Sequence, residues 1–152
     1  MKNYTVLKLK LSIRESDGDS RKQKYQFIRD AQYSQYRALN LGMGLLSSAY
    51  LKSNKDAKQD EYKSVRKSLT NSNPIFDGIQ FGTGIDTLSS VVKRVKKDFD
   101  NSIKNGLTKG ERNLTSYKRT YPLMTRGRDL KFRYEGDDIV IRWVHKIEFN
   151  VI

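Results

Sequence analysis

Cysteine is absent from the 152 residues, and histidine, tryptophan and proline are scarce, with one, one and two copies. Without cysteine the chain forms no disulfide and offers no thiolate as a metal ligand or nucleophile. The single histidine, His145, falls next to Trp143 in a segment with the pattern of a strand, where a structural role is expected. These absences exclude most metal and nucleophilic sites and fit a cytoplasmic chain.

Nucleotide-binding and catalytic motifs are missing as well. The sequence has no G-x-x-x-x-G-K-[ST], and "GMG" at 42–44 and "GTG" at 82–84 lack the strand-then-helix context and the third glycine of a dinucleotide loop. The acidic pairs at 60–61 and 137–138 fall at a helix start and in a turn, where capping or solvation accounts for them. We therefore expect no catalytic activity, no metal and no cofactor.

Long hydrophobic runs are also lacking. The first residues, "MKNYTVLKLKLSI", alternate between apolar and polar side chains, unlike the continuous apolar region of a signal peptide. No run approaches the 18 or more apolar residues of a membrane span. We expect neither secretion nor membrane insertion, and a protein that stays in the cytoplasm.

Positive charge is abundant, with 30 Lys and Arg against 17 Asp and Glu and a net charge of +13. An excess of this size is typical of a polyanion-binding protein, and nucleic acid is the leading candidate. A merely cationic surface is the plain alternative. A membrane surface is disfavoured, since no helix has bulky apolar residues opposite a lysine face.

The hydrophobic spacing predicts strands at both ends of the chain and helices between them. Alternation over 3–13 indicates a half-buried strand, and apolar residues three or four apart predict helices over 21–53, 60–70 and 85–103, the first capped by Asp19 or Ser20. Gly42 and Gly44 indicate either a close helix contact or a break near Asn40. Further strands are expected at 130–135, 138–145 and 147–152, with a turn at Gly136-Asp137.

This order predicts an α+β fold, in which the N-terminal strand pairs with the C-terminal strands across a helical insertion. The product is a small sheet or incomplete barrel. An exposed edge along 147–152 would invite pairing with another chain.

Basic residues concentrate on one face of the third predicted helix and in the stretch after it. Clusters of this kind bind phosphates, and Tyr117 and Tyr121 are placed to stack on unpaired bases. The candidate nucleic-acid contacts are Lys93, Arg94, Lys96, Lys97, Lys104, Lys109, Arg112, Tyr117, Lys118, Arg119, Tyr121, Arg126 and Arg128.

The loop over 71–84 is rich in Gly, Asn and Asp, yet it carries the apolar residues Ile75, Phe76, Ile79 and Phe81. These side chains need burial. They pack either onto the protein's own helices or at an interface with another protein chain.

Three segments carry a family resemblance: "QKYQFIRDAQYSQYRALNLGMGLLSSAYL" (23–51), "VKKDFDNSIKNGLTKGERNLTSYKRTYPLMTRG" (95–127) and "IVIRWVHKIEFNV" (139–151). Together they resemble the N-terminal portion of miniature type V-F CRISPR effectors, RNA-guided DNA nucleases similar to transposon-encoded TnpB. The resemblance spans essentially the whole chain.

The resemblance implies a wedge domain, a small barrel, formed by 1–15 and 114–152, and a helical recognition domain at 16–113. In that family these parts hold guide RNA, read the short protospacer-adjacent motif (PAM) of the DNA and dimerise two protomers. The sequence contains no counterpart of the family's RuvC-like carboxylates or Cys-rich zinc element, so DNA cleavage is not expected.

Three functions stay open at this point. The first is a truncated mimic that binds guide RNA, PAM DNA or an effector protomer, or pairs with itself, and acts as an anti-CRISPR. The second is a subunit of a split RNA-guided nuclease, and the third is a generic RNA-binding module.

Overall fold

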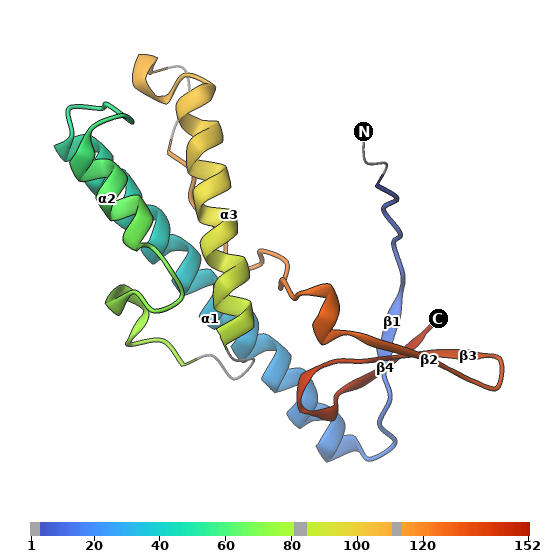
Figure 1. Ribbon diagram of the computed structural model, residues 1–152. Helices are drawn as coiled ribbons and strands as arrows, with labels where there is room; N and C mark the ends of the chain where they lie inside the picture. Colours follow the sequence, from blue (N-terminus) through green and yellow to red (C-terminus); the bar gives the residue numbers. More distant parts are fainter. Residues whose placement is uncertain (1–3, 81–84, 111–113) are drawn as a thin grey trace. The chain divides into compact units, whose positions relative to one another are not determined.

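The computed structural model describes residues 4–80, 85–110 and 114–152 (Figure 1). Three α-helices and a four-stranded antiparallel sheet confirm the α+β class. Contacts divide the chain into a sheet unit, which joins the residues up to Phe27 to those from Arg126 onward, and a helical unit, Ile28–Thr125. The wedge and recognition boundaries implied by the resemblance stay predictions.

The helices and strands follow one another along the chain in the predicted order. Their bounds are β1 Leu11–Ile13, α1 Gly18–Lys52, α2 Asp60–Ser68, α3 Ile85–Lys104, β2 Lys131–Glu135, β3 Asp138–Arg142 and β4 Glu148–Val151.

The N-terminal strand is much shorter than the predicted 3–13. Only residues 11–13 pair, with Val151, Asn150 and Phe149 of β4. Two further backbone bonds extend this pairing by one residue at each end, from the Ile152 N–H to the carbonyl of Lys10 and from the Arg14 N–H to the carbonyl of Glu148. Tyr4 and Val6 lie beyond this ladder and are exposed. Alternation was a misleading signal here, because a strand needs a hydrogen-bonding partner along its whole length.

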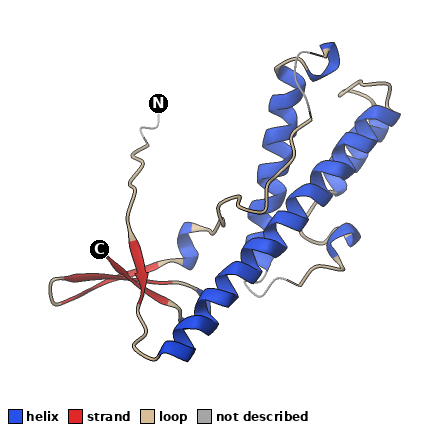
Figure 2. Cartoon of the chain, turned by 180° about the vertical axis from the view of Figure 1, so that it is seen from behind, coloured by secondary structure: helices blue, strands red, loops and turns tan. Residues whose placement is uncertain are grey.

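The strand order in the sheet is β1-β4-β3-β2, so the first strand does pair with the last across the helical insertion. Figure 2 shows the strands in red and the helices in blue. A two-residue turn at Gly136-Asp137 joins β2 to β3, as predicted; Gly136 has φ 61°, which suits the first position of a type II′ hairpin. Strand β4 lies between β1 and β3. The expectation of an exposed edge along 147–152 is therefore wrong, and the described edges are β1 and β2.

The third predicted strand ends early. Strand β3 stops at Arg142, and Val144–Lys146 form a turn closed by the bond from the Trp143 N–H to the carbonyl of Ile147, at 2.8 Å. His145 and Lys146 take left-handed backbone conformations there, with φ near 55° and 58°. His145 thus lies in a turn and not on a strand, with its ring 4.9 Å from that of Phe27.

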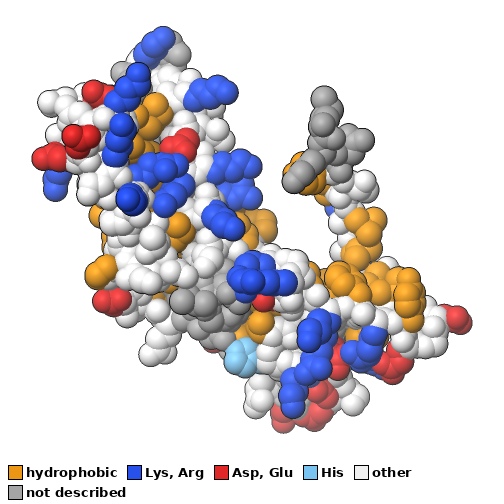
Figure 3. Space-filling view, viewed as in Figure 1, with side chains coloured by type: hydrophobic (Ala, Val, Ile, Leu, Met, Phe, Trp, Pro, Cys, Tyr) orange, Lys and Arg blue, Asp and Glu red, His pale blue; other side chains and the backbone are white. Residues whose placement is uncertain are grey.

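One face of the sheet is apolar and the other is charged. The register places Phe132 opposite Ile141 and Tyr134 opposite Ile139, and Phe132 and Tyr134 remain 63% and 82% exposed. In Figure 3 hydrophobic side chains gather over the strands. The opposite face carries ion pairs between Arg14 and Glu135, Arg133 and Glu135, and Arg133 and Glu148.

Hydrogen bonds from Arg14 and then Arg133 lower the pKa of Glu135 from its ordinary value to about 2. Because the folded-state pKa is depressed, the ion pairs stabilise the fold at pH values above the unfolded-state pKa of Glu135. This contribution to stability is lost as pH falls from about 4 to about 2.

We expect the carboxyl carbon of Glu135 to titrate near pH 2 by NMR. Arg14→Gln should move the midpoint toward the ordinary value; Arg142→Gln, on the same face, should leave it. A wild-type midpoint near about 4 would contradict the ion pairs.

Helix α1 is continuous over 35 residues. It begins after Asp17, whose carboxylate accepts bonds from the backbone N–H and the hydroxyl of Ser20, so the cap is Asp17 and not the predicted Asp19 or Ser20. No break occurs near Asn40. Gly42 instead marks a close helix contact, since a Cβ built there meets the side chain of Val95 at 3.3 Å, whereas one at Gly44 meets nothing within 4 Å.

The core of the helical unit forms where α1, α2 and α3 meet. It includes an aromatic cluster of Tyr50, Tyr62 and Phe99 with ring centroids 5.5 to 5.9 Å apart. In the loop after α2, Phe76 and Ile79 are buried in this core at 4% and 7% exposure, and Ile75 packs against it.

The burial of these loop residues favours packing onto the protein's own helices over a protein interface. Phe76 and Ile79 have almost no surface left for a partner, and this corrects their assignment as interface residues. The fourth candidate, Phe81, lies outside the described residues.

The contact at Gly42 predicts opposite effects for two helical glycines. Gly42→Val should lower the free energy of unfolding by about 1–3 kcal/mol, because the added methyl groups press on Val95 across the α1–α3 contact. The matched Gly44→Ala should raise it by about 0.5–1 kcal/mol through helix propensity alone. Urea unfolding followed by circular dichroism measures both, and a neutral Gly42→Val would contradict the packing.

Candidate nucleic-acid interface

The 114–125 segment, which precedes the sheet unit, has no regular secondary structure, yet side-chain amides of α1 hold its backbone. The buried amide of Gln35 donates to the carbonyl of Pro122 at 2.9 Å and accepts from the N–H of Met124 at 2.7 Å. Asn40 makes the same pair of bonds with both backbone groups of Tyr117, at 3.1 and 3.0 Å. We call these two residues and Gln32, which donates to the carbonyl of Tyr121 at 2.8 Å, the amide clamp.

Of the two tyrosines predicted to stack on bases, Tyr117 is buried and has a structural role instead. Tyr117 is 6% exposed, and its hydroxyl donates to the Asp98 carboxylate at 2.7 Å, so burial first and then this bond raise the pKa of Tyr117. Tyr121 is partly buried and contacts the Tyr117 ring edge to face, with centroids 5.3 Å apart. Tyr117 is therefore not available to a base.

The predicted basic residues of the 114–125 segment do reach solvent. The N–H of Tyr121 donates to the carbonyl of Lys118 at 2.9 Å, and this closes a four-residue turn. Lys118 and Arg119 are both exposed in it. The amide clamp holds the backbone on either side of this turn. Lys118 and Arg119 therefore start from a fixed backbone and do not belong to a flexible loop.

The outer face of α3 carries the next group. The inner face of α3 is the buried row Val91, Val95 and Phe99. On the outer face Lys93 and Lys97 lie one helical turn apart, and both are exposed. Within the described parts of the chain neither lysine has an ion-pair partner, whereas Arg94 lies 4.0 Å from the Asp98 carboxylate. In Figure 3 Lys and Arg side chains gather over α3.

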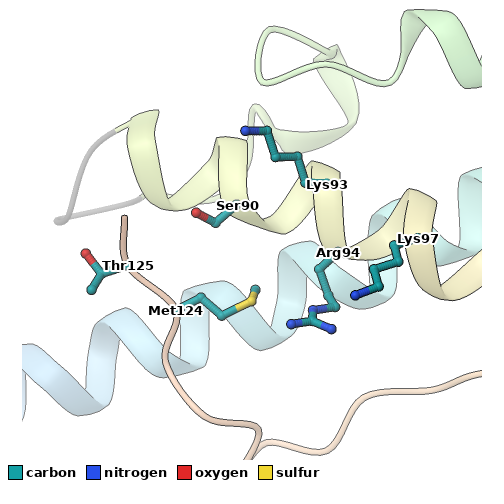
Figure 4. Close-up of a pocket in the computed structure, with 6 residues that line it drawn as sticks. All are labelled: Ser90, Lys93, Arg94, Lys97, Met124 and Thr125. Atoms are coloured by element: carbon teal, nitrogen blue, oxygen red, sulfur yellow. The ribbon is translucent and has the colours of Figure 1, made fainter. Parts of the chain in front are cut away.

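An open hollow of about 330 Å³ lies beside this lysine face. Figure 4 shows Ser90, Lys93, Arg94 and Lys97 projecting from α3, and Met124 and Thr125 coming from the 114–125 segment. The amide clamp holds the Met124 backbone directly, so it also fixes one wall of this hollow. A cationic wall beside a polar and apolar one suits a phosphate backbone with its attached sugars.

The other predicted cations have different environments. Lys96 is partly buried near Arg66 and Asp100, and burial first, then the positive charge of Arg66, lowers its pKa. Lys104 and Lys109 are exposed, Arg112 lies outside the described residues, and Arg126 and Arg128 belong to the sheet unit. Arg126 forms an ion pair with Asp129 at 3.3 Å.

An exposed aromatic residue on α1, Tyr33, was not among the predicted contacts. Tyr33 is 41% exposed, its ring stacks on that of Tyr36, and the guanidinium of Arg119 lies 4.7 Å from the Tyr33 centroid. The signal was present, since position 33 falls off the face defined by Leu39, Met43 and Leu46, and an aromatic on the outer face of a helix is uncommon.

The hydrogen bonds of the amide clamp predict that removing the Gln35 side chain strongly destabilises the fold. Gln35→Ala should lower the free energy of unfolding by about 2–4 kcal/mol, because the backbone groups of residues 122 and 124 lose their partner. Gln32→Ala, which removes a single bond, should cost about 1 kcal/mol. Urea unfolding measures both.

The rate of trypsin cleavage is a second measure of how firmly the clamp holds the 114–125 segment, since trypsin cleaves after Lys118 and Arg119. Cleavage there should be faster in Gln35→Ala than in wild type under conditions in which both are folded. Equal stability and equal cleavage would show that the clamp does not hold the segment.

No helix in the described part of the chain is long and apolar enough to cross a lipid bilayer. Among the same residues, His, Asp and Glu side chains nowhere gather in a group of three or more that could hold a metal ion. A scan against protein-family models gives no match, and a search of curated proteins finds no similar sequence.

Proposed function

We propose that this protein binds nucleic acid without catalysing a reaction on it, through the lysine face of α3 and the exposed turn of the 114–125 segment. The observation that carries the proposal is the pair Lys93 and Lys97, exposed, one turn apart and without ion-pair partners among the described residues. Like charges at this spacing repel, and a phosphate backbone relieves the repulsion while releasing its own counterions.

The resemblance to type V-F effectors directs the choice of ligand. It favours a guide RNA or PAM-containing DNA, with an effector protomer or a second copy as protein partner. The exposed apolar face of the sheet supports a wedge-type assignment, because the inner wall of a small barrel is apolar. A chain that occupies the guide competes with the effector for it, so we propose interference with CRISPR immunity as the biological consequence.

The salt dependence of affinity tests nucleic-acid binding directly. Lys93→Ala/Lys97→Ala should weaken binding to a structured guide RNA and reduce the slope of log K against log salt by about 1.4 to 1.8, as expected for two lost phosphate contacts. Fluorescence anisotropy at several salt concentrations gives this slope.

The matched control is Lys63→Ala/Lys67→Ala. These lysines are also exposed and four residues apart, and they too have no ion-pair partner among the residues that the structure describes, but they lie on α2. The control removes the same charge and should leave the slope close to wild type. If both double variants change the slope equally, the α3 face has no special role; if neither changes it, the proposal is wrong.

A cleavage assay separates the three functions. With a matched type V-F effector and its guide, excess protein should lower target cleavage, and the Lys93/Lys97 variant should lower it less. Cleavage that appears only when the protein is added to a separate nuclease half would favour the split-nuclease function. Equal affinity for the guide and an unrelated structured RNA at matched salt would favour a generic RNA-binding module.

A further inference from the structure

Tyr33 and Tyr36 form a pair of stacked rings on α1, of which Tyr33 is exposed and Tyr36 is partly buried. Their centroids are 6.0 Å apart and their planes 29° from parallel. Tyr33 is 41% exposed and Tyr36 partly so, and neither belongs to the buried core of the helical unit. An exposed aromatic ring supported by a second ring is a suitable surface for a third flat ring.

Two arginines flank this pair. The guanidinium of Arg119 lies 4.7 Å from the Tyr33 centroid and that of Arg37 lies 5.9 Å from it. Both arginines are exposed, and neither has a carboxylate partner among the residues that the structure describes. Each is long enough to contact a phosphate bound near the rings.

The amide clamp prepares this arrangement before any ligand binds. Arg119 lies in the turn closed between Lys118 and Tyr121, and Asn40 and Gln32 hold the backbone on its two sides. Positions fixed in advance reduce the ordering entropy that binding would cost. An open hollow of about 310 Å³, lined by Tyr36, Arg37, Asn40 and Leu41, adjoins the rings.

We propose that Tyr33 and Tyr36, with Arg37 and Arg119 beside them, form a stacking platform for an unpaired base of a single-stranded or looped nucleic acid. The platform rests on the proposed nucleic-acid binding and adds a preference for unpaired over paired strands. The Arg119 guanidinium lies over the Tyr33 ring, and Tyr36 stacks on the same ring. The base therefore takes the place of the guanidinium on Tyr33, and its flanking phosphates pair with the two arginines. The bases of a duplex are stacked on one another and cannot use it.

The test compares Tyr33→Ala with wild type on a labelled single strand of about 12 nucleotides and on the matching fully paired duplex. We expect single-strand affinity to fall by about 5- to 100-fold, the usual loss for one stacked base. Duplex affinity should change by less than about twofold, and the salt slope should not change, since no phosphate contact through a lysine is removed. The same assay with an RNA strand and with a DNA strand shows which of the two the protein prefers.

Tyr25→Ala is the matched control. Tyr25 lies on the same helix, is 42% exposed and has Arg21 5.8 Å from its centroid, but no second ring stacks on it. It should leave single-strand affinity within about twofold of wild type. Ala favours helix at both positions, so circular dichroism should confirm that each variant folds.

Tyr33→Trp gives an independent signal. Tryptophan keeps the stacking surface, so single-strand affinity should be retained, and the added emission should be quenched by single strands but not by duplex.

The outcomes separate the two proposals. If Tyr33→Ala binds single strands as wild type does, or loses single-strand and duplex affinity alike, the platform is wrong, while the salt slope of the Lys93/Lys97 variant still decides nucleic-acid binding. If wild type binds neither strand form, both proposals are wrong.

Discussion

The bonds between the buried amide of Gln35 and the backbone of residues 122 and 124 are the contact on which the proposed surface depends. A segment without regular secondary structure must satisfy its backbone groups somewhere, and here the side chains of a helix supply the partners. With Asn40 and Gln32 they convert a polar, basic connection into a fixed wall of the helical unit. Lys118 and Arg119 are then exposed to solvent on a backbone whose position is fixed.

Fixed cations and fixed rings act together on a nucleic acid. The lysines of α3 provide long-range, salt-dependent attraction without regard to base identity, and the tyrosine pair of α1 provides short-range contact with one base. The 114–125 segment links the two surfaces, since Met124 borders the hollow beside α3 and Arg119 lies over Tyr33. Buried polar side chains in the core thus set the arrangement of exposed charged ones.

The sequence predicted the helices and the hairpin, because these follow from apolar spacing and turn residues. It also predicted that the first strand pairs with the C-terminal strands, but not that β4 is its partner. It overextended β1 and β3, since alternation cannot show where a hydrogen-bonding partner ends, as at Leu11 and Arg142. It predicted Lys93 and Lys97 on an exposed face. It placed Tyr117 in the site and overlooked Tyr33, because only the fold reveals that Asp98 and Asn40 draw Tyr117 inward.

The most direct test of this account is to map where RNA touches the protein. A guide RNA containing 4-thiouridine, cross-linked by light and analysed by mass spectrometry, reports contacts residue by residue. The account predicts cross-linked peptides from three places: α1 around Tyr33, α3 around Lys93 and Lys97, and the turn at Lys118 and Arg119. Cross-links confined to the β2–β3 hairpin, with these three regions unmodified, would contradict it.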